Sequence, residues 1–146
     1  MERTILDLKL KAVRALVGRL NLSQNHEERK ELVSEVFLEL AKLPEGKSLI
    51  KKVGYSTDSN SAKKFAEDFL SLEIISEFLN DPDVEDIVID GLKPIFLHSS
   101  RRGFIKTDKQ FTNNRELELF IKKLIIFSGR TNIAAYPFGQ GIIWEV

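Results

Sequence analysis

The segment that most constrains the fold covers residues 78–107, where a helical pattern ends and short apolar runs begin. Pro82 cannot continue a helix, and it disfavours helical backbone at Asp81 before it. Asp90-Gly91 is a strong turn signal, because glycine adopts positive φ without steric cost. Three apolar runs are separated by two turn-forming segments: the runs are 84–89, 95–98 and 104–106, and the turns are 91–94 and 99–103. The segment therefore predicts a small antiparallel meander that follows a helix.

The first 54 residues show the spacing of amphipathic helices. Apolar residues recur at helical intervals near the start: Ile5, Leu8, Ala12, Val13, Leu16, Val17 and Leu20. Asn25 and Glu28 have capping-box spacing ahead of a second apolar stripe. Residues 43–46 are expected to end that helix, and a short third helix is expected over residues 48–53, with Gly54 as its C-terminal glycine. Residues 1–54 are therefore expected to form a helical subdomain.

The rest of the chain combines helical and strand patterns. Residues 55–61 are polar and aperiodic, and predict a linker. Apolar spacing over residues 65–79 predicts one broken helix or two short ones. Asn113 and Glu116 repeat the capping-box spacing before a final helix that Ser128-Gly129 ends.

A last strand is expected over residues 141–146, and the chain stops inside its pattern, which suggests a piece of a longer protein. The expected fold class is α+β, with an N-terminal helical unit followed by a small antiparallel sheet flanked by helices. The expected domains are the helical subdomain, the linker and an α+β domain over residues 62–146.

The amino-acid composition excludes several classes of protein and of binding site. Of the 146 residues, 42% are hydrophobic, which is enough for a core. Lys+Arg and Asp+Glu both number 22, so no net charge draws the chain to nucleic acid, and no nucleic-acid partner is expected. The absence of cysteine excludes disulfides and cysteine-based metal sites. The start is amphipathic, and no run reaches the ~18 apolar residues of a membrane span. A cytoplasmic location is expected.

Few sequence motifs suggest a catalytic, metal-binding or phosphate-binding site. Gly46-Lys47-Ser48 resembles the second half of a phosphate-binding loop, but the motif needs a glycine where Ala41 stands and a strand leading in. A turn between helices is the better interpretation. His26 and His98 lie far apart, with no carboxylate at ligand spacing, and the acidic residues of the 81–90 segment fit a solvated turn and strand. We expect no metal site and no catalytic residues, so an enzyme acting alone is the weakest class.

Three arginines are the candidate binding residues. Arg101 and Arg102 lie at the expected hairpin tip, where they could meet a phosphate or an acidic partner, or could simply be exposed turn residues. Arg130 follows a helix end, where it could satisfy the last carbonyls or bind an anion.

The segment from Phe78-Leu79-Asn80-Asp81-Pro82 through Gly91 resembles a signature of the secretion ATPases of type II and type IV secretion, type IV pilus assembly and the archaeal motility filament. The family pattern is a helix, L-x-D-P-x-V-x-D-I-x-V-N-G, a hairpin, a Thr, a Phe, a long helix and G-R. Residues 94–97 and 102–104 match the hairpin, and Thr107, Phe111, the helix through Phe127 and Gly129-Arg130 follow in order. The resemblance covers residues 70–132. Asp90 stands where the family usually has Asn, and residues 136–146 hold no arginine where the family has an arginine-bearing segment.

The resemblance implies the N-terminal domain of a cytoplasmic hexameric motor at the inner face of a membrane. Such a domain packs over the nucleotide of a C-terminal RecA-like ATPase domain, which this chain lacks, and docks onto inner-membrane platform or secretion-machine proteins. ATP and Mg are implied for the full-length protein, and no cofactor for this chain. Its expected partners are its own ATPase domain and neighbouring subunits.

A second hypothesis, from a different functional class, stays open beside the motor-domain hypothesis. The chain could be a stand-alone protein-interaction module with a degenerate secretion-ATPase scaffold and no catalysis.

Overall fold

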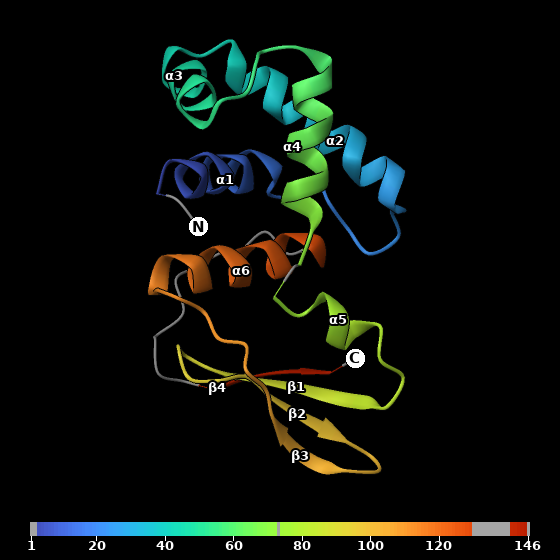
Figure 1. Ribbon diagram of the computed structural model, residues 1–146. Helices are drawn as coiled ribbons and strands as arrows, with labels where there is room; N and C mark the ends of the chain where they lie inside the picture. The colour runs from blue at the N-terminus through green and yellow to red at the C-terminus, as the bar shows by residue number, and fades with distance from the viewer. Residues whose placement is uncertain (1–2, 73, 130–140, 146) are drawn as a thin grey trace. The chain divides into compact units, whose positions relative to one another are not determined.

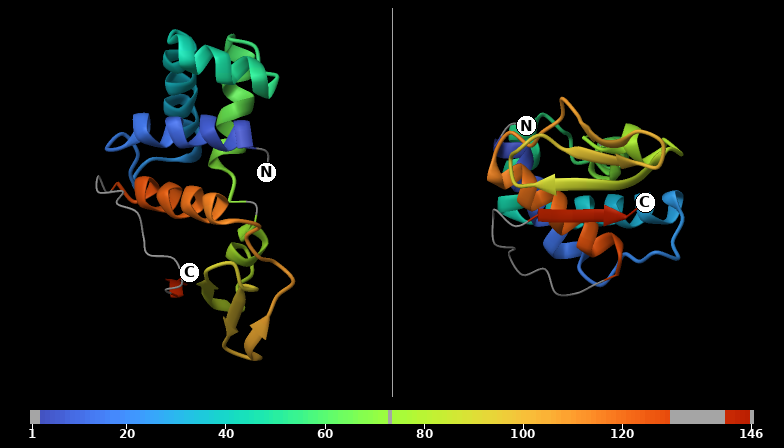
Figure 2. Two further views of the ribbon diagram at one scale, coloured as in Figure 1. Left: turned by 90° about the vertical axis from the view of Figure 1, so that its left-hand side faces the viewer. Right: turned by 90° about the horizontal axis from the view of Figure 1, so that it is seen from below.

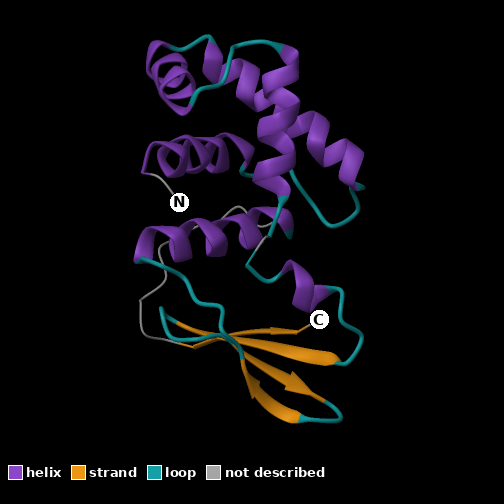
Figure 3. Ribbon diagram, in the orientation of Figure 1, coloured by secondary structure: helices purple, strands orange, loops and turns teal. Residues whose placement is uncertain are grey.

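The computed structural model describes residues 3–72, 74–129 and 141–145 (Figure 1). The helices in these residues are α1 (Arg3–Leu16), α2 (His26–Ala41), α3 (Pro44–Val53), α4 (Ser59–Leu70), α5 (Ser76–Leu79) and α6 (Asn114–Phe127). The strands are β1 (Val84–Asp90), β2 (Phe96–Ser99), β3 (Gly103–Lys106) and β4 (Gly141–Glu145), as Figure 3 shows. The fold is α+β, with a helical unit followed by a small antiparallel sheet that has helices before and after it in the chain.

The chain divides into two compact units. A helical unit contains α1 to α4 and the part of α6 from Leu119 onward, and a sheet unit contains α5, the strands and the start of α6 up to Glu118. This division differs from the expected 1–54, 55–61 and 62–146 pattern, because α4 packs along α2 and belongs with the first helices.

The helix ends of the helical unit follow local sequence rules. The capping box is present at α2, where the Asn25 side chain accepts a hydrogen bond from Glu28 N at 2.8 Å and the Glu28 carboxylate accepts one from Asn25 N. Helix α3 begins at Pro44, four residues before the expected start at Ser48, because proline is well suited to the first helical position. Gly54 ends this helix with a φ of +96°, as expected.

Helix α4 begins inside the segment expected to be a linker. The carboxylate of Asp58 caps it by accepting a hydrogen bond from Ser61 N at 2.9 Å, so residues 59–61 form its first turn. The broken apolar pattern over residues 65–79 corresponds to two helices, α4 and α5.

Aromatic rings fill the core of the helical unit. Phe37 of α2 lies 5.3 Å from Phe65 of α4 between ring centroids, and Tyr55 meets both rings edge-on. Phe65 and Phe69 continue the cluster at 5.8 Å, and Phe127 meets Phe69 edge-on. Each buried ring removes a large apolar area from water, so the cluster stabilises the packing of α2 against α4.

The sheet unit contains a four-stranded antiparallel sheet in the order β3-β2-β1-β4. Figure 2 shows β4 lying alongside β1. In the register of this pair, Val88 is opposite Ile143. The expected meander is confirmed as β1, β2 and β3, and the expected last strand as β4. Val84 is buried and Glu85 exposed, as the alternation predicts.

Helix α6 has the apolar character expected of it. Asn113 Oδ1 accepts a hydrogen bond from Glu116 N at 3.0 Å, and the Glu116 carboxylate accepts one from Thr112 N at 3.2 Å. Gly129 follows the helix with a φ of +86°. Among the described residues, no helix combines the length and apolarity needed to cross a membrane.

Candidate functional site

The turn between β2 and β3 carries Arg101 and Arg102, at the hairpin tip where the sequence predicted them. The Ser99 hydroxyl oxygen accepts hydrogen bonds from Arg101 N at 3.2 Å and Arg102 N at 3.1 Å. Gly103 then begins β3 with a φ of +70°, a conformation that glycine adopts without strain. These contacts hold the two arginines side by side on one tight turn.

One carboxylate lies beneath both arginines. Ser99 Oγ donates to Asp83 Oδ2 at 2.7 Å, and Arg102 Nε donates to the same oxygen at 3.2 Å. Arg101 Nε lies 3.8 Å from Asp83 Oδ1. The Ser99 hydrogen bond, followed by the Arg102 contact, lowers the pKa of Asp83 below its ordinary 3.8, although burial acts in the opposite direction. Asp83 is therefore ionised at neutral pH and offsets one of the two positive charges.

A shallow polar pocket of about 490 Å³ opens at this turn. It is lined by Pro82, Asp83, Ser100, Arg101 and Arg102. Both guanidinium groups turn Nε toward Asp83, and no other ion pair of theirs is found in the described part of the chain. Their terminal nitrogens can bind a phosphate or a carboxylate, while the arrangement contains no group suited to a catalytic step.

Arg130, the third candidate, lies outside the described residues. Its role as a helix-end or anion-binding residue stays a prediction. Gly46-Lys47-Ser48 lies inside α3, so these residues form a helix rather than a phosphate-binding loop.

Tertiary contacts bring carboxylates to both histidines, through strand pairing at His98 and through the packing of α2 against α4 at His26, and sequence spacing did not show this. The register of β1 against β2 shifts between Val84 and Asp86, and His98 Nδ1 lies 3.1 Å from Asp86 Oδ2 and 3.5 Å from Glu85 Oε2. His26 Nε2 lies 3.2 Å from Glu67 Oε1 in the helical unit. In the described residues, no three such side chains are placed to share a metal ion.

The sequence reasoning missed an aromatic surface on the sheet. Phe104 of β3 is 70% exposed and Phe96 of β2 is 38% exposed. The His98 ring lies 4.9 Å from the Phe104 ring, its cross-strand neighbour. The apolar runs contained this signal, but the sequence alone did not indicate which face of each strand is exposed.

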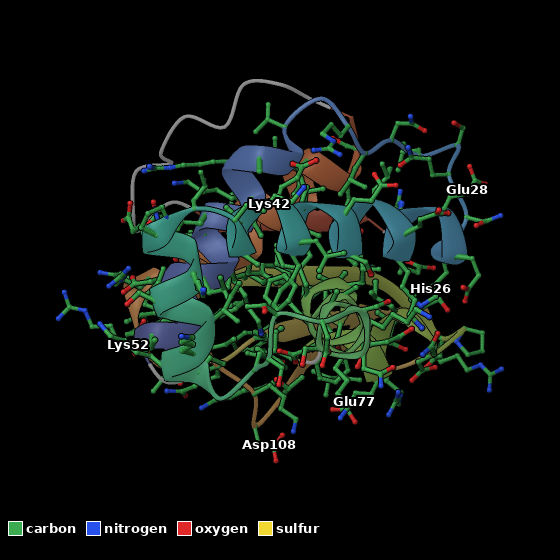
Figure 4. All side chains as sticks on the ribbon, turned by 90° about the horizontal axis from the view of Figure 1, so that it is seen from above. His26, Glu28, Lys42, Lys52, Glu77 and Asp108 are labelled. Atoms are coloured by element: carbon green, nitrogen blue, oxygen red, sulfur yellow. The ribbon has the colours of Figure 1, made fainter. Side chains whose placement is uncertain are left out.

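His26, Glu28 and Lys52 are exposed side chains of α2 and α3, and they form no cluster comparable to the hairpin turn. Figure 4 shows His26 and Glu28 at one end of α2, with Lys42 just past its other end and Lys52 on α3. The hairpin turn is therefore the best-defined polar cluster that brings predicted candidate residues together.

A comparison of the chain with models of protein families gives no match, and a comparison with curated proteins gives none either.

Proposed function

We propose that this chain is the N-terminal regulatory and assembly domain of a hexameric secretion or pilus-assembly ATPase. In this role it packs over the nucleotide site of a C-terminal motor domain outside these 146 residues. It acts at the inner face of the membrane, docking onto platform or secretion-machine proteins and neighbouring subunits. ATP and Mg belong to the motor domain, so the chain alone has no ATPase activity.

The observation that carries this proposal is the order of elements in the segment that resembles the family. Helix α5 ends at Leu79, Asn80 and Asp81 turn the chain, and β1, β2 and β3 follow as an antiparallel meander before α6. Gly91 lies in the first turn with a φ of +56°, a value that favours the glycine of the signature.

Two further residues of the signature have structural roles that support the proposal. The Thr107 hydroxyl donates to Ile95 O at 2.7 Å, and Thr107 N donates to the same carbonyl at 2.9 Å. This pair of bonds ends the hairpin. Phe111 is 5% exposed and lies just before α6. Both residues therefore organise the connection from hairpin to helix.

One observation favours the alternative, a stand-alone protein-interaction module without catalysis. The Nε atoms of Arg101 and Arg102 face Asp83, whose charge weakens the attraction of the turn for a phosphate. A carboxylate on a protein partner needs less positive charge than a triphosphate does.

The mass of the native polypeptide distinguishes the two functions. An antibody raised against this chain is used on extracts of its source cells, with the purified 16.7 kDa chain as size standard. A product large enough for an added RecA-like domain supports the motor proposal. A product of 16.7 kDa overturns it and supports the stand-alone module.

If the longer product is found, ATPase assays on that protein test the arginines. Replacing Arg101, Arg102 or Arg130 with alanine should lower activity if the side chain contacts nucleotide. Unchanged activity in all three variants would assign them to other contacts, and Lys93→Ala is a matched surface control because Lys93 lies in the preceding turn.

A further inference from the structure

Strand β3 forms one edge of the sheet. The strand order β3-β2-β1-β4 gives it β2 as its neighbour on one side, and no described strand pairs with its other side. An edge strand presents backbone N–H and C=O groups that can pair with a strand from another chain.

The register identifies which backbone groups face outward. Thr107 N donates to Ile95 O at 2.9 Å, so residue 107 directs its backbone toward the β2 side. Backbone direction alternates along an antiparallel strand. Ile105 therefore directs its N–H and C=O toward β2, whereas Phe104 and Lys106 direct theirs to the open edge.

The side chains at this edge extend the same surface. Phe104 and Lys106 are exposed, and Phe96 is the cross-strand neighbour of Lys106. An exposed phenylalanine beside free amide groups offers an apolar contact as well as hydrogen bonds to an added strand.

Charge indicates what kind of strand would bind. Residues 91–107 contain four cationic residues, Lys93, Arg101, Arg102 and Lys106, and no acidic residue. Lys93 pairs with Asp90, and Arg101 and Arg102 share Asp83, whereas no ion pair of Lys106 is found in the described part of the chain. Two copies of this hairpin would repel each other, whereas an acidic strand would be attracted.

We propose that β3 binds an extended acidic peptide segment of a partner protein by strand addition. Opposite Lys106, Ile105 and Phe104 the added strand carries an acidic, an apolar and a second apolar residue. The acidic side chain pairs with Lys106 and one apolar side chain packs on Phe104. This inference rests on the edge strand alone and holds whether or not the chain belongs to a motor.

The test uses the 146-residue chain and a capped peptide, Ser-Glu-Val-Val-Glu-Ser, whose pattern is the same in both strand directions. The control peptide has lysine in place of both glutamates. NMR titration should shift the amide signals of Phe104 and Lys106 with the glutamate peptide and leave them unchanged with the lysine peptide. Hydrogen exchange at these two amides should slow.

Three variants separate the contributions of the apolar contact, the charge contact and the backbone hydrogen bonds to peptide binding. Phe104→Ala should weaken peptide binding about fivefold through the lost cross-strand contact. Lys106→Glu should reverse the preference, so that the lysine peptide binds more tightly than the glutamate peptide. Lys106→Pro removes an outward amide without removing a β2 hydrogen bond, and should weaken binding about tenfold. Lys52→Ala in α3 and Leu22→Ala before α2 remove an exposed cation and an exposed apolar side chain from the helical unit, and these matched controls should retain binding.

Several outcomes overturn the proposal. Equal shifts with both peptides, or shifts centred outside β3, exclude selective strand addition. If Lys106→Glu still prefers the glutamate peptide, the charge contact is excluded. This variant tests the proposal by itself if Lys106→Pro does not fold. Phe104-dependent binding of phosphatidylglycerol vesicles or of oligothymidine, without peptide binding, assigns the surface to a different partner.

Discussion

The hydroxyl group of Ser99 donates a 2.7 Å hydrogen bond to the carboxylate of Asp83, joining the end of β2 to the residue before β1. The same hydroxyl oxygen accepts the N–H groups of Arg101 and Arg102. Ser99 is 1% exposed, so its hydroxyl depends on these partners for its hydrogen bonds. One buried serine thus connects the start of the sheet with the turn that carries the candidate binding residues.

Ser99→Ala should lower the melting temperature by about 3 °C and raise the pKa of Asp83 toward 3.8. Because the folded-state pKa of Asp83 is below its unfolded value, its contribution to stability is present above pH 3.8 and is lost as pH falls through the folded-state pKa. Thermal melts at pH 7 and an NMR titration of the Asp83 carboxyl carbon measure both effects. Ser100→Ala is the control, because its hydroxyl is exposed and 3.5 Å from Asp83. An unchanged pKa in Ser99→Ala would contradict the assigned cause.

Gly46→Ala should destabilise the helical unit by about 2 kcal/mol, although alanine is favoured over glycine in helices by about 1 kcal/mol. A Cβ at position 46 would overlap the backbone carbonyl of Leu40, because α3 begins close against the end of α2. Urea unfolding measures the change. Ser48→Ala, at an exposed position of the same helix, should be neutral or slightly stabilising. A stabilised Gly46→Ala would show that the two helices are not this close.

Asp68→Ala should destabilise the chain more than Lys9→Met does. Lys9 Nζ lies 2.8 Å from Asp68 Oδ2, with the Lys9 side chain 5% exposed and that of Asp68 38% exposed. Removing the carboxylate leaves a buried ammonium without this partner, at a cost of about 2 kcal/mol given the exposure of Asp68. Lys9→Met replaces the ammonium with an apolar group of similar size. Denaturant unfolding of both variants measures the free energy of unfolding. A larger loss of that free energy in Lys9→Met than in Asp68→Ala would refute the prediction.

Arg29→Ala should destabilise the helical unit by about 2 kcal/mol. The Arg29 guanidinium donates to Phe127 O at 3.1 Å and to Asn21 O at 2.6 Å, and it lies 5.4 Å from the Phe127 ring centroid. These contacts satisfy a carbonyl at the end of α6, so hydrogen exchange should increase first in that turn. Glu31→Ala, an exposed position of the same helix, should change stability by less than about 0.5 kcal/mol. Equal exchange at the end of α6 in both variants would exclude the proposed contact.

Local sequence rules predicted most elements of the fold. The capping spacing of Asn25 and Glu28 located the start of α2, and Gly54 and Gly129 located two helix ends, because these signals act within one helical turn. Pro82 and Gly91 located both ends of β1 for the same reason. Pro44 was interpreted as a stop when it is the first residue of α3, because proline is compatible with either role.

The candidate site was predicted only in part. The sequence placed Arg101 and Arg102 on a hairpin tip, but it gave no sign that Asp83 and Ser99 lie beneath them, since that contact depends on the pairing of β1 with β2. The carboxylates near His98 were missed for the same reason. Pairing and register are tertiary properties, and a shift of one residue would turn each side chain to the opposite face.

The sequence by itself determined the helices, the turns and the strands, because caps, glycines and prolines act through neighbouring residues. Only the tertiary structure decided that α4 belongs with the first helices, that Gly46 meets Leu40, and that Phe104 lies on the edge strand of the described sheet. The physical reason is that packing joins residues far apart in the chain, and their contact energies depend on distances that no local pattern contains.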